Sequence, residues 1–228
     1  LLYPCAILRI LGFGLETVYK LYVFAVTVAT AFVARYVLRK MTGSERAALL
    51  GAALYTLSLY RLTNVYVRAA VGEYTAMLFL PLVIYGLWRI YTQGPQGGRK
   101  PAGWCWLPLA LGFTGLLQSH LLTTVMAGLF TVVFCLVMVK RTFTKPVITE
   151  LLKAAGAAVL WNLWFLVPLL QYMATGVCSI ASSNSGAFMG DSAVFIGQIF
   201  MMFGHTGYAN SITMGMQDEM YFSVCLTL

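Results

Sequence analysis

One uncharged segment constrains the fold of this chain more than any other feature. Residues 104–139 run for 36 positions without a single Lys, Arg, Asp or Glu. As one α-helix the segment would be about 54 Å long, nearly twice the roughly 30 Å thickness of a bilayer's hydrocarbon core. Its only polar interruption is Gln118-Ser119-His120. We therefore predict two apolar helices that form a hairpin, with the turn at residues 118–120.

The composition of the whole chain agrees with a membrane protein. Of its 228 residues, 60% are hydrophobic and only 10% are charged. A soluble domain carries roughly a quarter of charged residues, because its surface must face water. The lipid-facing sides of membrane helices are free of that requirement, so the sequence predicts an all-α integral membrane protein. The net charge of +8 then reflects Lys and Arg in cytoplasmic loops, and no nucleic acid partner is expected.

Apolar runs divide the chain into three regions. Residues 1–172 are predicted to form a polytopic helical bundle of about six complete spans. Residues 173–219 are rich in Gly, Ser, Asn and Met and are predicted to form an extracytoplasmic loop, whose apolar run 193–203 is too short to span and forms an interfacial helix. Residues 220–228 are expected to begin a further, truncated span. The six spans are predicted at 17–38, 47–60, 74–91 with a kink at Pro81, the two halves of 104–139, and 154–172 with Pro168 near its end; Gly and Pro make 92–103 a loop.

The basic residues test this segmentation independently. Three loops, at 35–46, 89–103 and 140–153, hold 4, 3 and 4 basic residues, which is 11 of the 15 in the chain. The connections between them hold only Arg61 and Arg68. The positive-inside rule requires this alternation of six successive spans. We therefore predict a protein of the cytoplasmic (inner) membrane, with these less basic connections on the extracytoplasmic face.

The first candidate site residues are Arg61, Asn64 and Arg68. They stand at positions i, i+3 and i+7, which share one face of a continuous helix. Guanidinium groups suit phosphate or carboxylate because their donor fork matches two oxygens. Alternatively, both arginines cap the preceding helix and extend their side chains to the membrane interface.

Two further candidates are Glu73 and His120. Glu73 is either a base or metal ligand, or a carboxylate that interacts favourably with the N-terminus of the next helix. His120 either binds a phosphate or sugar and moves a proton, or completes the hairpin turn. The five cysteines are scattered without metal-ligand spacing, so no metal site is predicted from them. Motifs of the types GxxxxGK, HExxH and GxSxG are absent from the sequence.

Several stretches resemble bacterial membrane proteins of the GT-C glycosyltransferase-like group. The resemblance is closest to those called YfhO-like or 6-pyruvoyl-tetrahydropterin-synthase-related. It covers about residues 1–172, and its most specific part is the run Arg-Ala-Ala-x-Gly-Glu. The stretches that carry it are TGS (42–44), AALLGAALY (47–55), YRLTNVYVRAAVGE (60–73) and GLLQSHLL (115–122).

The resemblance implies a GT-C-like enzyme that moves a sugar from a polyprenyl-phosphate carrier to an extracytoplasmic acceptor. In that group the catalytic acidic residue lies in the first outer loop, which would precede Leu1, so no catalytic residue is assigned. Arg61, Asn64, Arg68, Glu73 and His120 are then candidates for binding the lipid-linked sugar, and the resemblance allows for a divalent metal ion that helps to hold its phosphate. The alternatives are a transporter or flippase, and a non-catalytic membrane scaffold. The sequence indicates neither the sugar nor the oligomeric state.

Overall fold

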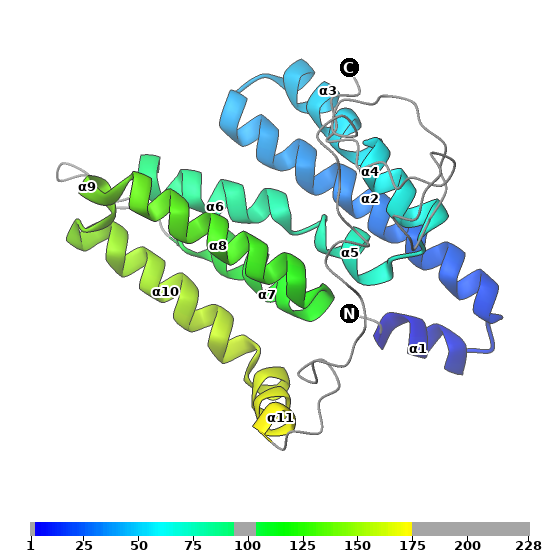
Figure 1. Cartoon of the computed structure of the whole chain (residues 1–228). Coiled ribbons are helices and arrows are strands. Elements are labelled where there is room, and N and C mark those ends of the chain that lie inside the picture. The colour runs from blue at the N-terminus through cyan, green and yellow to red at the C-terminus, as the bar shows by residue number, and fades with distance from the viewer. Residues whose placement is uncertain (1–2, 94–103, 175–228) are drawn as a thin grey trace, which may run out of the picture. The chain divides into compact units, whose positions relative to one another are not determined.

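The computed structural model describes residues 3–93 and 104–174, and every element in these ranges is a helix. The described chain divides into two compact units. The larger unit combines Leu1–Thr56 with Val71–Leu166, and the smaller unit combines Leu57–Ala70 with Val167–Leu228. The predicted loop 173–219 lies outside the described residues except for 173–174, which belong to the last helix and not to a loop. The predicted helix at 193–203, the span start at 220–228 and most of the loop 92–103 also lie outside the described residues. Figure 1 labels the α-helices, which are α1 (Tyr3–Ile10), α2 (Leu15–Thr42), α3 (Glu45–Thr56), α4 (Leu59–Leu62), α5 (Val71–Ala76), α6 (Leu80–Gln93), α7 (Leu107–Ser119), α8 (Leu121–Val137), α9 (Val139–Thr142), α10 (Lys145–Trp161) and α11 (Leu163–Ala174). A short π-helix, η1 (Thr63–Val67), lies between α4 and α5 in the sequence.

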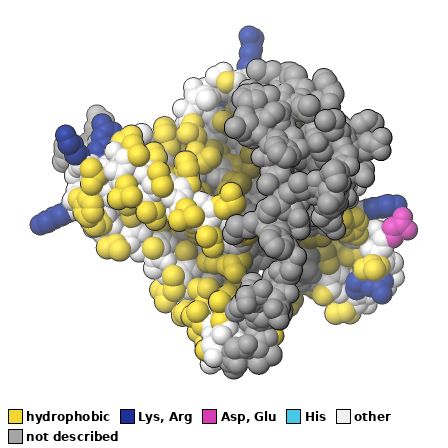
Figure 2. Space-filling view, viewed as in Figure 1, with side chains coloured by type: hydrophobic (Ala, Val, Ile, Leu, Met, Phe, Trp, Pro, Cys, Tyr) yellow, Lys and Arg dark blue, Asp and Glu magenta, His cyan; other side chains and the backbone are white. Residues whose placement is uncertain are grey.

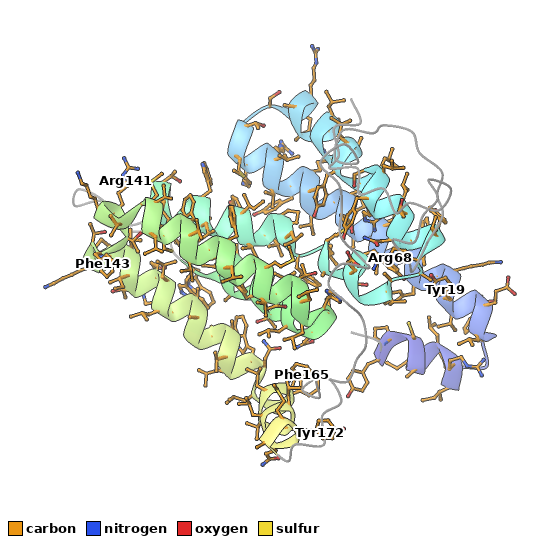
Figure 3. All side chains as sticks on the ribbon, viewed as in Figure 1. Tyr19, Arg68, Arg141, Phe143, Phe165 and Tyr172 are labelled. Atoms are coloured by element: carbon orange, nitrogen blue, oxygen red, sulfur yellow. The ribbon has the colours of Figure 1, made fainter. Side chains whose placement is uncertain are left out.

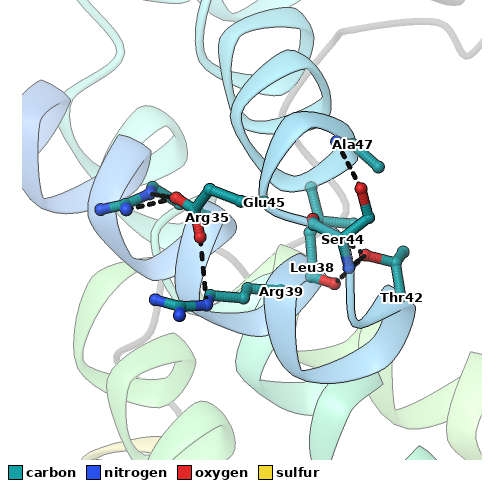
Figure 4. Close-up of polar contacts among 7 residues, drawn as sticks. All are labelled: Arg35, Leu38, Arg39, Thr42, Ser44, Glu45 and Ala47. Atoms are coloured by element: carbon teal, nitrogen blue, oxygen red, sulfur yellow. Dashed lines mark hydrogen bonds and ion pairs between the residues drawn. The ribbon is translucent and has the colours of Figure 1, made fainter.

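The first predicted span is the long helix α2, which has 28 residues. It ends at Gly43, whose φ of 71° is left-handed and whose N–H donates to the carbonyl of Arg39. The chain then returns as α3, which packs along α2. Figure 4 shows that Glu45, in the first turn of α3, pairs with both Arg35 and Arg39 of α2. The helix α3 has 12 residues, so the predicted span at 47–60 is shorter than expected and is interrupted before α4.

The third predicted span contains the expected interruption next to Pro81. A turn at residues 77–79 separates α5 from α6, although Val71–Thr92 together are apolar and long enough to span a membrane. Proline has no N–H, so Pro81 cannot donate to the carbonyl of Met77, four residues earlier. Tyr55 of α3 supplies that hydrogen bond, with 2.6 Å between its hydroxyl and the Met77 oxygen. A side chain from another helix thus compensates for the break.

The helical hairpin predicted at 118–120 is present. The helices α7 and α8 are separated by His120 alone, whose backbone is extended with φ −155° and ψ 110°. They have 13 and 17 residues, or about 20 and 26 Å, so each is shorter than a full span. The apolar core of the larger unit lies among α6, α7, α8 and α10. Its buried members include Val83, Leu87, Ile90, Leu109, Leu116, Ala127 and Ala154.

The predicted single helix at 154–172 differs from the structure. The helix α10 begins at Lys145, and the chain bends by 73° where α11 follows it. The bend lies at Asn162 and not at Pro168, which is inside α11. Asn162 is buried; its Nδ2 donates to the carbonyl of Ala158 at 2.7 Å, and its Oδ1 accepts from Gln118 of α7 at 3.0 Å. The polar side chain at the break is therefore satisfied by hydrogen bonds.

Length and composition support a membrane location. Two helical stretches, Leu15–Thr42 and Val71–Thr92, are suited to cross a bilayer, and the bent pair α10–α11 would be a third. Figure 2 shows hydrophobic side chains spread over the face that α8 contributes to, with Lys and Arg gathered at its α9 end, where Arg141 projects outward in Figure 3. Apolar surface of this kind suits lipid. The number of six spans stays a prediction.

Candidate functional site

Three predicted site residues lie in the smaller unit, on α4 and η1. Arg61, in α4, has 1% of its surface exposed and Asn64, in η1, has none. A side chain that extended to the membrane interface would be far more exposed, so the burial of Arg61 disfavours that alternative for it. The sequence predicts a polar helix face at Arg61, Asn64 and Arg68, and in the structure Arg61 and Asn64 are buried.

The helix η1 is a π-helix, and Arg68, the residue that ends it, contacts Asn64 inside it. The N–H of Arg68 donates to the carbonyl of Thr63, five residues earlier, at 2.9 Å. The guanidinium Nη1 of Arg68 donates to Oδ1 of Asn64 at 2.8 Å. Ala69, with a left-handed φ of 48°, ends this turn. Arg61, Asn64 and Arg68 were predicted to share one face of a continuous helix, whereas the segment is divided between α4 and η1, and Asn64 and Arg68 are in contact. Their role in binding stays a prediction; Figure 3 labels Arg68 among the side chains of this segment.

Only the oxygen of the Asn64 side-chain amide takes part in this contact. Its oxygen accepts from Arg68, while its buried Nδ2 has no hydrogen-bond partner among the residues the structure describes. Buried amide donors are rarely left in that state, because the lost hydrogen bond to water costs about 1–3 kcal/mol. Asn64 therefore presents a donor beside a guanidinium group, a combination that suits an oxygen-rich anion.

Glu73 and His120, the other two predicted residues, lie in the larger unit. Gly72 makes their approach possible: a Cβ at Gly72 would lie 2.7 Å from the carbonyl oxygen of Ser119 and 3.3 Å from Cδ2 of His120. The first turn of α5 thus packs directly on the junction of α7 and α8. Glu73 is half-buried and follows Gly72 directly, so its backbone lies next to this junction. The five predicted residues therefore form two groups, one in each unit.

His120 occupies the junction with a defined orientation. Its Nδ1 accepts from the N–H of Thr123 at 3.3 Å and lies 2.8 Å from the Thr123 hydroxyl, so the side chain caps the N-terminus of α8. A ring nitrogen that accepts from an N–H carries no proton itself. In the neutral ring the proton is consequently assigned to Nε2.

Hydroxyl-bearing residues that the sequence reasoning missed follow Glu73 directly. The hydroxyls of Thr75 and Tyr22 lie 2.9 Å apart, and the rings of Tyr22 and Tyr74 approach to 6.4 Å between centroids. Tyr74 is fully buried. Their position beside Glu73 in the sequence was the available signal, whereas the contribution of Tyr22 from α2 is visible only in three dimensions.

A second missed residue is Glu150, which lies in the predicted loop 140–153. It is 6% exposed, accepts from the backbone N–H of Trp106 at 3.2 Å, and pairs with Lys153 at 2.8 Å. The carboxylate thus ties α10 to the start of α7, which is a structural role. Its spacing of three residues from Lys153 was visible in the sequence, but its burial was not.

No metal site is evident in the described part of the chain. Residues 3–93 and 104–174 contain no group of three His, Cys, Asp or Glu side chains that could hold a metal ion. The three cysteines in these ranges, Cys5, Cys105 and Cys135, form no disulfide with one another. A divalent ion stays a prediction from the resemblance alone.

Comparisons with known proteins give one informative match. No protein-family model matches the chain, and no solved structure matches it. A protein of Lactococcus lactis subsp. cremoris (strain MG1363), described only as uncharacterized, is 27% identical over 156 residues. The match covers 65% of this chain and 24% of that protein, so the chain corresponds to about a quarter of the relative's length. In its described ranges the chain is all-helical, and some of its apolar helices are suited to cross a membrane. The description of the relative names no activity.

Proposed function

We propose that this chain belongs to a polytopic inner-membrane protein that transfers a sugar from a polyprenyl-phosphate carrier to an extracytoplasmic acceptor. The proposal rests chiefly on one observation, the contact between Arg68 and Asn64 in η1 with the buried Nδ2 of Asn64 beside it. The resemblance of the 60–73 segment to GT-C glycosyltransferase-like proteins supplies the reaction. The phosphate of the carrier supplies the anion that this site would bind.

Charge complementarity favours a phosphate over other ligands. Residues 57–70 contain two arginines and no Asp or Glu. The guanidinium of Arg68 and the amide Nδ2 of Asn64 are both hydrogen-bond donors, and a phosphate offers several acceptor oxygens to such a pair. The site therefore suits the charged end of a lipid carrier better than the sugar itself.

The topology that we propose places this segment where such a carrier presents its sugar. Six spans and the alternation of basic loops would put residues 61–73 and 118–120 on the extracytoplasmic face. The helices suited to cross a membrane support part of this arrangement. An apolar helical surface would accommodate the polyprenyl tail.

Binding of undecaprenyl phosphate to the purified full-length protein in lipid nanodiscs tests the proposal. Arg68→Gln should weaken binding about tenfold or more, because a charge-assisted hydrogen bond contributes about 1.5–3 kcal/mol. The exposed Arg46 provides the matched control, and Arg46→Gln should bind as the wild type does. Undecaprenol, which lacks the phosphate, should bind weakly to all three proteins. Equal affinity of the two arginine variants would refute the phosphate site.

A flippase is the second candidate, favoured by the bend of 73° at the buried Asn162. Broken helices with polar residues at the break line the binding sites of many transporters. In proteoliposomes a flippase would move a fluorescent polyprenyl phosphate between leaflets without transferring a sugar. A glycosyltransferase would transfer the sugar and would not move the polyprenyl phosphate between leaflets.

A further inference from the structure

The connection between α8 and α10, in the larger unit, carries three cations at the end of an apolar helix surface. The last turn of α8 exposes Leu136 and Val137. Lys140, Arg141 and Lys145 follow, and all three are exposed. Figure 2 shows the hydrophobic face to which α8 contributes, with Lys and Arg side chains at its α9 end. Positive charge therefore lies next to a surface that suits lipid.

These three cations have no acidic partner among the residues that the structure describes. The nearest acidic residue in the sequence, Glu150, pairs with Lys153 instead. The basic connection between α2 and α3 differs, because Glu45 there pairs with both Arg35 and Arg39 (Figure 4). The cations of the α8–α10 connection are therefore available to an anion from outside the described residues.

Thr142 holds this connection in place. Its buried hydroxyl lies 2.6 Å from the hydroxyl of Tyr91 in α6 and 2.8 Å from the carbonyl oxygen of Cys135 in α8. The residues on either side of it are exposed, and Phe143 has 70% of its surface accessible. Figure 3 labels Arg141 and Phe143 at this end of the larger unit. An anchored backbone thus presents a guanidinium group and an apolar ring close together.

Two of these side chains are not explained by the helices alone. Lys145 is the first residue of α10, where the positive end of the helix macrodipole disfavours a cation. Phe143 is exposed but lacks the polar group that Trp and Tyr bring to a membrane interface. An anion beside Lys145 and an acyl chain beside Phe143 would stabilise both.

We propose that the α8–α10 connection binds the headgroup of an acidic phospholipid, such as phosphatidylglycerol, in the leaflet that borders this end of α8. The fork of the Arg141 guanidinium matches two phosphate oxygens, and Lys140 and Lys145 add attraction for net negative charge. Phe143 and the last turn of α8 contact the acyl chains. This apolar neighbourhood favours a lipid over a soluble anion. The inference goes beyond the proposed function and does not depend on it.

Lipid-specific fluorescence quenching tests the site in the full-length protein. A bimane fluorophore on Thr144→Cys, an exposed position, in a Cys-less background reports which lipids lie beside the connection. The protein is placed in phosphatidylcholine vesicles that contain the same fraction of doxyl-labelled phosphatidylglycerol or doxyl-labelled phosphatidylcholine. Phosphatidylglycerol should quench more strongly, and about 1 M salt should remove most of the difference, since the Debye length is then only about 3 Å. Both leaflets carry the labelled lipid, so the orientation of the protein does not matter.

Substitution of the cations should reduce this preference. Lys140→Gln and Arg141→Gln should each lower the association of phosphatidylglycerol relative to phosphatidylcholine by about fivefold. The combined exchange of Lys140→Arg with Arg141→Lys retains both charges and should retain the preference. Arg46→Gln is the matched control, because Arg46 is an exposed cation of the other basic connection, and its effect should stay within about twofold.

Three results would overturn the lipid site. Equal quenching by the two labelled lipids in the wild type would show that the cations serve another occupant, such as an acidic protein segment. An equal loss of preference in Arg46→Gln and Arg141→Gln would attribute the enrichment to the net charge of the whole protein. Loss of the preference in the exchange variant would show that charge does not determine it. Each result leaves the proposed sugar transfer unaffected.

Discussion

At the scale of single residues, close approach at Gly72 decides whether the α5 junction forms. The carbonyl oxygen of Ser119 is backbone and cannot rotate away from an added Cβ at 2.7 Å. The neighbouring ring of His120 is held by Thr123. The packing of α5 on α7 and α8 therefore depends on the absence of a side chain at position 72.

Gly72→Ala should accordingly destabilise the protein by about 1–3 kcal/mol, as overpacking does in a well-packed core. Gly128, inside α8, is the matched control because a Cβ there meets nothing within 4 Å. Gly128→Ala should stabilise the helix by about 0.5–1 kcal/mol. Thermal unfolding in detergent, followed by circular dichroism, measures both changes. A Gly72→Ala protein as stable as Gly128→Ala would contradict the packing described here.

Residue-scale prediction from the sequence succeeded where the signal was local. The shared face of Asn64 and Arg68 follows from spacing alone, and the contact is present. The position of His120 at the hairpin turn follows from a polar break in an apolar run. Glu150 was missed because its burial depends on the start of α7, which is distant in the sequence. Burial of a charged residue is a tertiary property, and no local pattern reports it.

At the scale of helices, the positions of the breaks between helices agree better with side-chain hydrogen bonds than with the positions of proline residues. Pro81 lies beside a break that Tyr55 compensates, whereas Pro168 lies within α11 without ending it. The sharp bend lies instead at Asn162, where Gln118 donates to the side chain. Proline marks where a backbone donor is missing, but the direction of the chain depends on which side chains satisfy the freed groups.

The contact between Gln118 and Asn162 should be measurable as a coupling energy. A double-mutant cycle with Gln118→Ala, Asn162→Ala and the double variant should give about 0.5–1.5 kcal/mol, the range for hydrogen bonds between membrane helices. Each single variant should be less stable than the wild type because the partner is left buried without its bond. Additive effects of the two changes would show that the hydrogen bond contributes nothing to the stability of the folded protein. Reversible unfolding in mixed micelles provides the free energies.

At the scale of the whole molecule, the composition predicted an all-helical chain suited to a membrane, but it did not predict where each helix ends. The excess of apolar residues indicates a membrane protein, and helices long enough to cross a bilayer are present. Hydropathy counts apolar length, so it treated 47–60 and 154–172 as single helices, although α3 ends at Thr56 and α10 ends at Trp161. The six-span topology rests on the alternation of basic loops, which the fold by itself does not test.

Thiol labelling of single cysteines in intact cells tests that topology most directly. In a Cys-less background, Tyr66→Cys offers an exposed position in η1, since Tyr66 is 77% exposed while Asn64 is buried. Arg141→Cys, at the exposed α9 end, is the control for the cytoplasmic side. We predict that an impermeant maleimide labels Tyr66→Cys from outside intact cells and labels Arg141→Cys only after lysis. Labelling of Arg141→Cys from outside, with Tyr66→Cys protected until lysis, would place the arginine segment in the cytoplasm and contradict the proposed site.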